Sequence, residues 1–127
     1  MAERRESVKS IQLEGFSAES ARKGDSVHVL LKGNADMAAQ DKLRIFLDAL
    51  SSSARKNRPK EAVFDLAELY FMNSSCLSLL LRFINGVVES SAGDRYTLRF
   101  RSNPNLKWQQ KSLRALHAYA KDLVVVE

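Results

Sequence analysis

The sequence is poor in the residues that build disulfides and metal sites. It contains one cysteine, Cys76, so no intramolecular disulfide can form, and only two histidines, His28 and His117. It has no HExxH pattern and no CxxC pair, so a zinc site would lack its nitrogen and sulfur ligands. A single thiol is typical of proteins in the reducing cytoplasm, where disulfides are rare. We therefore expect a cytoplasmic protein without a bound metal.

Glycine is also scarce, and its placement excludes several kinds of chemistry. The five glycines form neither a GxGxxG pattern nor a Walker loop, so the backbone offers no cradle for nucleotide phosphates. There is no GxSxG elbow to expose a nucleophilic serine. The sequence therefore predicts no cofactor and no enzymatic activity.

No apolar run approaches the roughly 18 residues that a membrane-spanning helix requires. The first ten residues are charged and lack the apolar segment of a secretory signal, so we expect a flexible tail at 1–10. The hydrophobic fraction of 45% suffices for a core, and we expect one domain over 11–127. The net charge of +5 permits an acidic partner or a nucleic acid but indicates neither.

Hydrophobic periodicity predicts strands that alternate with helices along the chain. Such an alternation favours a mainly parallel sheet with right-handed crossovers. The predicted fold class is thus α/β, a mixed sheet of four to five strands with helices packed against it. The expected strands are 11–16, 27–31, 62–66, 96–101 and 123–126, the first two as a hairpin, and the expected helices are 37–53, 76–88 and 104–120.

The most informative stretch runs from Val63 to Leu77, with the sequence VFDLAELYFMNSSCL. It ends a buried strand and then brings Ser74 and Ser75 to the start of a helix. A helix N-terminus has unpaired N–H groups and a positive dipole, so it accommodates a phosphate. Such a phosphate adds about −1.5 to −2 charges at neutral pH. The same serines, with Asn73, also suit helix capping alone, so both interpretations stand.

This stretch resembles the STAS family, the domain of bacterial anti-sigma-factor antagonists. The family signature is a strand VxxDL followed by xxxxFMDSSGLGxLL, and this chain has AVFDLAELYFMNSSCLSLLL. Upstream, LLKGNAD resembles the family's LxGELD. Downstream, LRFRSNPNLKWQQKSL resembles its fourth strand and the xNPxVxxxL that opens its third helix. The resemblance covers about residues 11–126 and implies a STAS-like (SpoIIAA-like) fold.

The resemblance also implies a function. Ser75 matches the family's phosphorylated serine and Ser74 the serine before it. This match implies a protein-binding regulator in a partner-switching pathway, acted on by an anti-sigma-like serine kinase and a PP2C-type phosphatase. Asn73 replaces the family's acidic residue, and Cys76 replaces its glycine beside the hydroxyls. The resemblance makes both residues candidates for partner binding. These departures leave a second possibility: a STAS subunit of a multiprotein complex, such as a lipid-transport assembly, without phosphorylation.

Three further features bear on partners. Leu79, Arg82 and Phe83 lie at one margin of the apolar arc of helix 76–88, where they indicate either a docking strip or deep burial. Cys76 lies near a helix start, where a thiolate is favoured, so it is either a redox switch or a small buried residue. A basic region is either a solvated face or, less favoured, a nucleic-acid surface. It comprises Arg99, Arg101, Lys107, Lys111 and Arg114.

Overall fold

A computed structural model describes residues 8–127 of the chain. Within them, the strands and helices alternate as the periodicity predicts. The strands are β1 (Ile11–Leu13), β2 (Phe16–Lys23), β3 (Ser26–Ala35), β4 (Glu61–Asp65), β5 (Leu69–Met72), β6 (Thr97–Arg101) and β7 (Val124–Val126). The α-helices are α1 (Gln40–Asn57), α2 (Ser74–Val88) and α3 (Lys107–Tyr119), and two short 3-10 helices are η2 (Met37–Ala39) and η3 (Ala92–Asp94).

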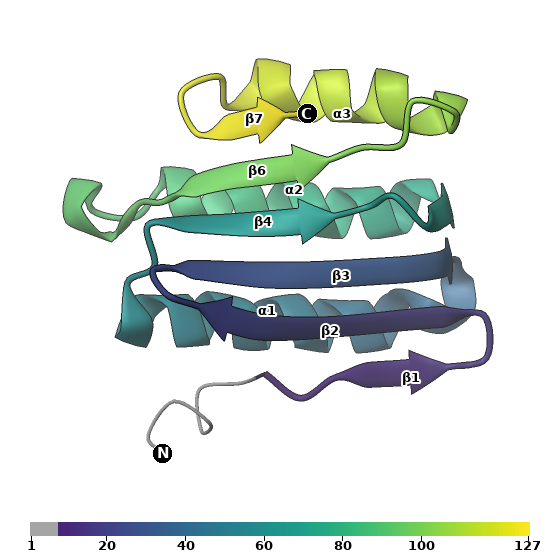
Figure 1. Cartoon of the computed structure of the whole chain (residues 1–127), viewed down its shortest axis with the longest axis horizontal. Helices are drawn as coiled ribbons and strands as arrows, with labels where there is room; N and C mark the ends of the chain where they lie inside the picture. Colours follow the sequence, from purple (N-terminus) through teal and green to yellow (C-terminus); the bar gives the residue numbers. More distant parts are fainter. Residues whose placement is uncertain (1–7) are drawn as a thin grey trace.

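The strands form one mixed sheet in the order β1-β2-β3-β4-β6-β7 (Figure 1). β1, β2 and β3 are antiparallel, whereas β3, β4, β6 and β7 pair in parallel. β5 continues beyond β4 and pairs in parallel with the end of β3. The α/β class is confirmed, and the described residues form seven strands in place of the four to five predicted.

The extra strands have two origins. The predicted strand 11–16 is in fact two, because the chain turns at Glu14-Gly15 into the long strand β2. In β2 only Phe16 and Ala18, in the first half of the strand, are buried, and the second half is mostly polar. The alternation of apolar and polar residues along β2 is therefore too weak to predict the strand. The other addition, β5, comes from the segment expected to be a loop before α2.

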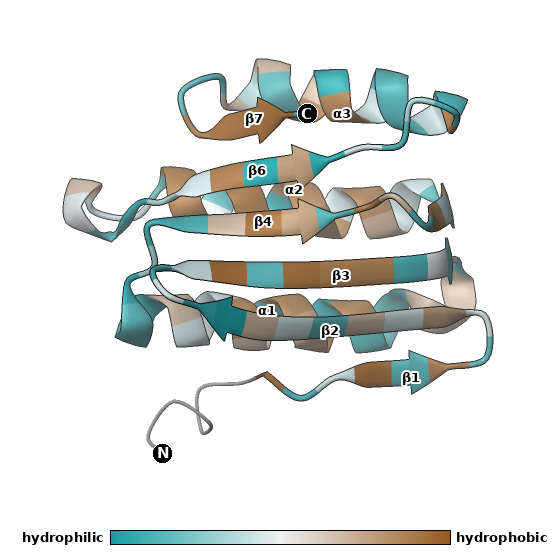
Figure 2. Cartoon of the chain, viewed as in Figure 1, coloured by the Kyte–Doolittle hydropathy of each residue, from teal (hydrophilic) through white to brown (hydrophobic). Residues whose placement is uncertain are grey.

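The helices α1 and α2 lie side by side behind the sheet, and the opposite face of the sheet carries no helix (Figure 1). Apolar residues concentrate in the central strands and on the sheet-facing sides of the helices (Figure 2). At the centre of the core, the ring of Phe64 stacks on Phe100, with centroids 5.0 Å apart, and meets Phe83 edge to face at 5.7 Å. Such aromatic pairs add to the stabilisation from burial alone.

The helix boundaries differ from the predictions by one to four residues at most ends, and α2 begins at Ser74 instead of Cys76. Asp36 caps η2 through a 3.0 Å bond to the Ala38 N–H, as expected, but α1 continues to Asn57, through the segment expected to be a loop. The third helix begins at Lys107 instead of 104. Asn103 does not cap it, because its side chain binds the Ala67 carbonyl and the Asn105 N–H. Of the predicted tail, residues 1–7 lie outside the described residues, and Val8 packs against the core.

Gly33 allows β3 to change its partner from β4 to β5. Its φ of +95° lies in the left-handed region, and a Cβ there would meet the Gly15 carbonyl oxygen at 2.1 Å. The pairing register shifts between Gly33 and Asn34, and the Gly33 N–H donates to the Glu68 carbonyl at 2.8 Å. Only glycine fits both the backbone angle and this close approach. Gly33 therefore permits the irregularity at which β3 begins to pair with β5.

The loop between β4 and β5 is held by a buried glutamine of α3. Gln109 is fully buried, and its amide donates to the carbonyls of Leu66 at 2.7 Å and Leu69 at 3.1 Å. Its side-chain oxygen accepts from the Asn103 N–H at 2.7 Å. These bonds pair backbone groups at the point where the sheet ladder is interrupted, which a buried segment requires. Gln109 thus sets the position of the chain that enters β5 and then α2.

We predict that Gln109→Leu lowers the free energy of unfolding by about 1–3 kcal/mol, because the carbonyls of Leu66 and Leu69 and the Asn103 N–H lose their hydrogen bonds to this buried side chain. Urea denaturation followed by circular dichroism measures this loss. The matched control is Gln110→Leu, at the exposed neighbouring position, with an expected change within about 0.5 kcal/mol. Equal stability of Gln109→Leu and wild type would contradict the role assigned to this side chain.

Candidate functional site

Ser74 and Ser75 lie at the N-terminal end of α2, as the sequence predicts, but they are its first two residues instead of preceding it, and both are exposed. They lie at the sheet edge where β3 ends and β5 leads into the helix (Figure 1). In the first turn of a helix, backbone N–H groups have no carbonyl one turn earlier to bind. The two hydroxyls therefore sit at a positively polarised, solvent-accessible helix end.

Asn73 fixes this end of the helix. Its side-chain oxygen accepts from the Cys76 N–H at 2.8 Å, and its own N–H donates to the Ala35 carbonyl at 2.9 Å. Asn73 is therefore a helix cap and a link between α2 and the end of β3. Asparagine caps a helix about as well as aspartate. The replacement of an acidic residue by Asn73 preserves this local geometry and removes one negative charge.

Cys76 is fully buried beneath the serines, so it does not form part of the surface that a partner would contact, contrary to our expectation. Its Sγ lies 3.6 Å from the Asp36 carbonyl oxygen. Burial raises the pKa of the Cys76 thiol, and the Asp36 carboxylate raises the pKa further. A helix start alone favours a thiolate, but here desolvation outweighs it. The geometry favours the interpretation of Cys76 as a small buried residue.

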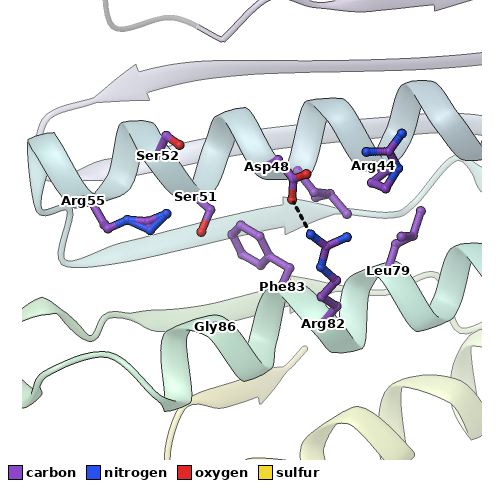
Figure 3. A pocket seen from close by; sticks show the side chains of 10 residues that line it. Arg44, Asp48, Ser51, Ser52, Arg55, Leu79, Arg82, Phe83 and Gly86 are labelled. Atoms are coloured by element: carbon purple, nitrogen blue, oxygen red, sulfur yellow. Dashed lines mark ion pairs between the residues drawn. The ribbon is translucent and has the colours of Figure 1, made fainter.

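The predicted docking strip on α2 divides into buried and exposed parts. Phe83 is only 6% exposed and belongs to the core, because α1 covers that side of α2 and widens its buried arc. Leu79 is half-buried, and Arg82 is exposed and pairs with Asp48 of α1 at 3.5 Å. All three nevertheless line a groove of about 380 Å³ between α1 and α2 (Figure 3).

Large apolar side chains are exposed on the two segments that adjoin the start of α2. Met37 of η2 is 81% exposed, and Tyr70 and Phe71 of β5 are 55% and 47% exposed. Their segments are adjacent, because Ala35, two residues before Met37, pairs with Met72. Apolar groups that gather on a surface are a mark of interaction sites. None of the three is among the residues that the sequence singles out, although Tyr70 and Phe71 lie within the stretch from Val63 to Leu77.

The basic region is less uniform than its sequence suggested. Arg99 pairs with Glu61 at 3.2 Å and with Glu127 at 2.8 Å, and Arg101 pairs with Glu127 at 3.5 Å. These two arginines lie on the uncovered face of the sheet, whereas the other basic residues of the region lie on α3. Carboxylates neutralise part of the charge of the two arginines, and the five basic residues are divided between the sheet and α3, so they do not form one continuous basic surface of the kind that tracks a phosphate backbone.

Among residues 8–127, no three histidine, cysteine, aspartate or glutamate side chains converge as a metal site would require. None of the helices within this range is long and apolar enough to cross a membrane.

Comparison with known proteins identifies the fold. No protein-family model matches the sequence, and no curated protein is significantly similar to it. The structure is similar to that of an anti-sigma factor antagonist from Mycobacterium paratuberculosis, with a TM-score of 0.66, 14% identity, and coverage of 90% of this chain and 88% of the other. It is also similar to the anti-sigma factor antagonist SpoIIAA in its unphosphorylated form, with a TM-score of 0.52, 20% identity, and coverage of 88% and 87%.

Both similarities extend over nearly the whole chain, so the protein has the STAS-like (SpoIIAA-like) fold that its sequence motif predicts. Sequence identities this low establish the fold and leave the function to the site itself.

We predict that iodoacetamide alkylates Cys76 at least about tenfold more slowly in the folded protein than in urea, because the thiol is buried and its pKa is raised. Mass spectrometry of timed samples measures the rates. The matched control, Cys76→Ala combined with Ser74→Cys, moves the thiol to an exposed neighbouring position and should react quickly in both states. Fast alkylation of Cys76 in the folded wild type would support the redox interpretation instead.

Proposed function

We propose that the protein is a non-enzymatic regulator that binds a protein partner through the surface around Ser74 and Ser75, and that phosphorylation of Ser75 weakens this binding. The observation that carries the proposal is the placement of two exposed serine hydroxyls at a capped helix N-terminus, next to segments that carry exposed apolar side chains. The apolar groups provide contact area, and the helix end accommodates a phosphate.

A charge change at this position acts on binding more than on folding. A phosphoserine at the helix N-terminus interacts favourably with the dipole, so α2 remains intact. The same group adds nearly two negative charges to the proposed binding surface. These charges are strongly hydrated, and their water would have to be removed when a partner binds. Phosphorylation at Ser75 would therefore release a partner without unfolding the domain.

The structural neighbours support a regulatory role of this kind. Both are described as anti-sigma factor antagonists, and one of them was determined in an unphosphorylated form. By this similarity, the partners to expect are an anti-sigma-like serine kinase and a PP2C-type phosphatase. Asn73 retains the helix cap that positions the serines, so the hydroxyls remain available to such a kinase.

We predict that Ser75→Asp lowers partner affinity at least about tenfold, or about 1.4 kcal/mol, while the melting temperature changes little. Ser75→Ala should bind as the unmodified protein does. The partner is isolated by pull-down from the native host, its affinity is measured by titration calorimetry, and phosphosites are mapped by mass spectrometry of the native protein.

The matched control is Ser91→Asp, an equal charge change at an exposed serine just beyond the other end of α2, which should leave the affinity unchanged. Equal binding by wild type, Ser75→Ala and Ser75→Asp, with no phosphate on Ser74 or Ser75, would disprove the switch. A constitutive, non-phosphorylated subunit of a complex would then be the better account.

A further inference from the structure

Ser75 begins a straight stripe of side chains on α2. Ser75, Leu79, Arg82 and Gly86 follow one another at spacings of four, three and four residues, so they lie on one face of the helix. The last three of these residues line the groove between α1 and α2. The serine that we propose as the switch therefore stands at one end of this groove, one helical turn before Leu79.

A matching stripe on α1 forms the opposite wall. Arg44, Asp48, Ser51 and Arg55 have the same spacing, and all four line the groove (Figure 3). Both helices connect parallel strands by crossovers, so they run in the same direction. The Asp48–Arg82 ion pair, at 3.5 Å, joins the two walls midway along the groove.

The groove combines an apolar floor with a cationic rim. Phe83 and Leu79 of α2 and Leu47 of α1 provide apolar surface between the helices. The charged residues that line the groove are three arginines, Arg44, Arg55 and Arg82, and one carboxylate, that of Asp48.

Within the described residues, Arg44 and Arg55 are exposed and form no ion pair. Their guanidinium groups are therefore available to carboxylates of another molecule.

Gly86 widens the groove at its far end. It lies within α2, where glycine lowers helix stability by roughly 0.5–1 kcal/mol relative to alanine. Its φ is not positive, and an added Cβ would meet no atom within 4 Å. Neither the backbone angle nor internal packing therefore requires glycine at this position. The missing side chain leaves open space opposite Ser51 and Arg55.

We propose that the groove between α1 and α2 binds an acidic amphipathic segment of the protein partner. The apolar side chains of this segment would contact Leu79 and Phe83, and its carboxylates would pair with Arg44 and Arg55. The identification of the occupant follows from charge complementarity with the arginine rim. This inference rests on the proposed function, which supplies the protein partner, and it specifies that the partner's docking segment is acidic and amphipathic. Because Ser75 stands at the end of the groove, its phosphate would repel the same acidic segment.

The test uses a designed probe. The probe is a fluorescein-labelled helical peptide of about four turns, with leucines along one face and glutamates beside them, and a second peptide carries lysine in place of every glutamate. Fluorescence anisotropy measures their dissociation constants. The glutamate peptide should bind the wild-type protein at least about tenfold more tightly than the lysine peptide, and its affinity should fall as the salt concentration rises.

Two variants locate the binding. Arg44→Glu combined with Arg55→Glu should weaken binding of the glutamate peptide at least about tenfold. Lys107→Glu combined with Lys111→Glu makes the same charge change at exposed positions of α3 and should weaken it far less. Gly86→Leu should block the groove while the melting temperature stays equal or rises, since leucine favours the helix more than glycine does.

The proposal that the groove binds an acidic segment is disproved by any of three results. These are equal binding of the two peptides, the same effect of the α1 and α3 double variants, or an unchanged affinity in Gly86→Leu. The switch is tested separately by Ser75→Asp in the same titration. If Ser75→Asp binds the glutamate peptide as wild type does while the groove variants fail to bind, the acidic docking surface stands and the regulation by Ser75 does not.

Discussion

The hydrogen bonds of Gln109 are the interactions on which the geometry of the site depends. Between β4 and β5 the chain leaves the regular sheet ladder, and within this turn the Leu69 N–H donates to the Leu66 carbonyl at 3.1 Å. The amide of Gln109 donates to the carbonyls of both residues, and Asn103, in the connection between β6 and α3, donates to the Ala67 carbonyl. A segment of α3 thereby holds the loop that leads into β5, and through it the start of α2.

The same edge of the sheet is constrained from the opposite side. Gly33 lets β3 bend toward β5, and the Ala35 carbonyl accepts the Asn73 N–H at the first step into α2. The serines are therefore held from two directions by backbone contacts, although their own side chains are exposed. These contacts fix the backbone that carries the hydroxyls, as a site for the proposed modification of Ser75 would require.

Features of this structure that depend on residues close together in the sequence could be predicted from it, and features that depend on residues far apart could not. Asn73, Ser74 and Ser75 could be placed at a helix start because capping involves residues only three positions apart. Gln109 could not be assigned its role, because it binds carbonyls 40 and 43 residues away and a polar residue on a helix suggests solvent. The periodicity of α2 alone predicts Phe83 at the margin of the buried face, because it contains no information about the packing of α1 against that side. The groove itself required two helices to be brought together.

The central claim is that the partner binds across the serine-bearing start of α2 and the adjoining groove. Hydrogen exchange of the isolated complex, compared with the free protein, tests it most directly, because it locates the contact without any substitution. The account predicts protection confined to α2 near Ser75 and to the facing turns of α1, with α3 and the uncovered face of the sheet unchanged. Protection on α3 or on β6 and β7, with none at the start of α2, would contradict it.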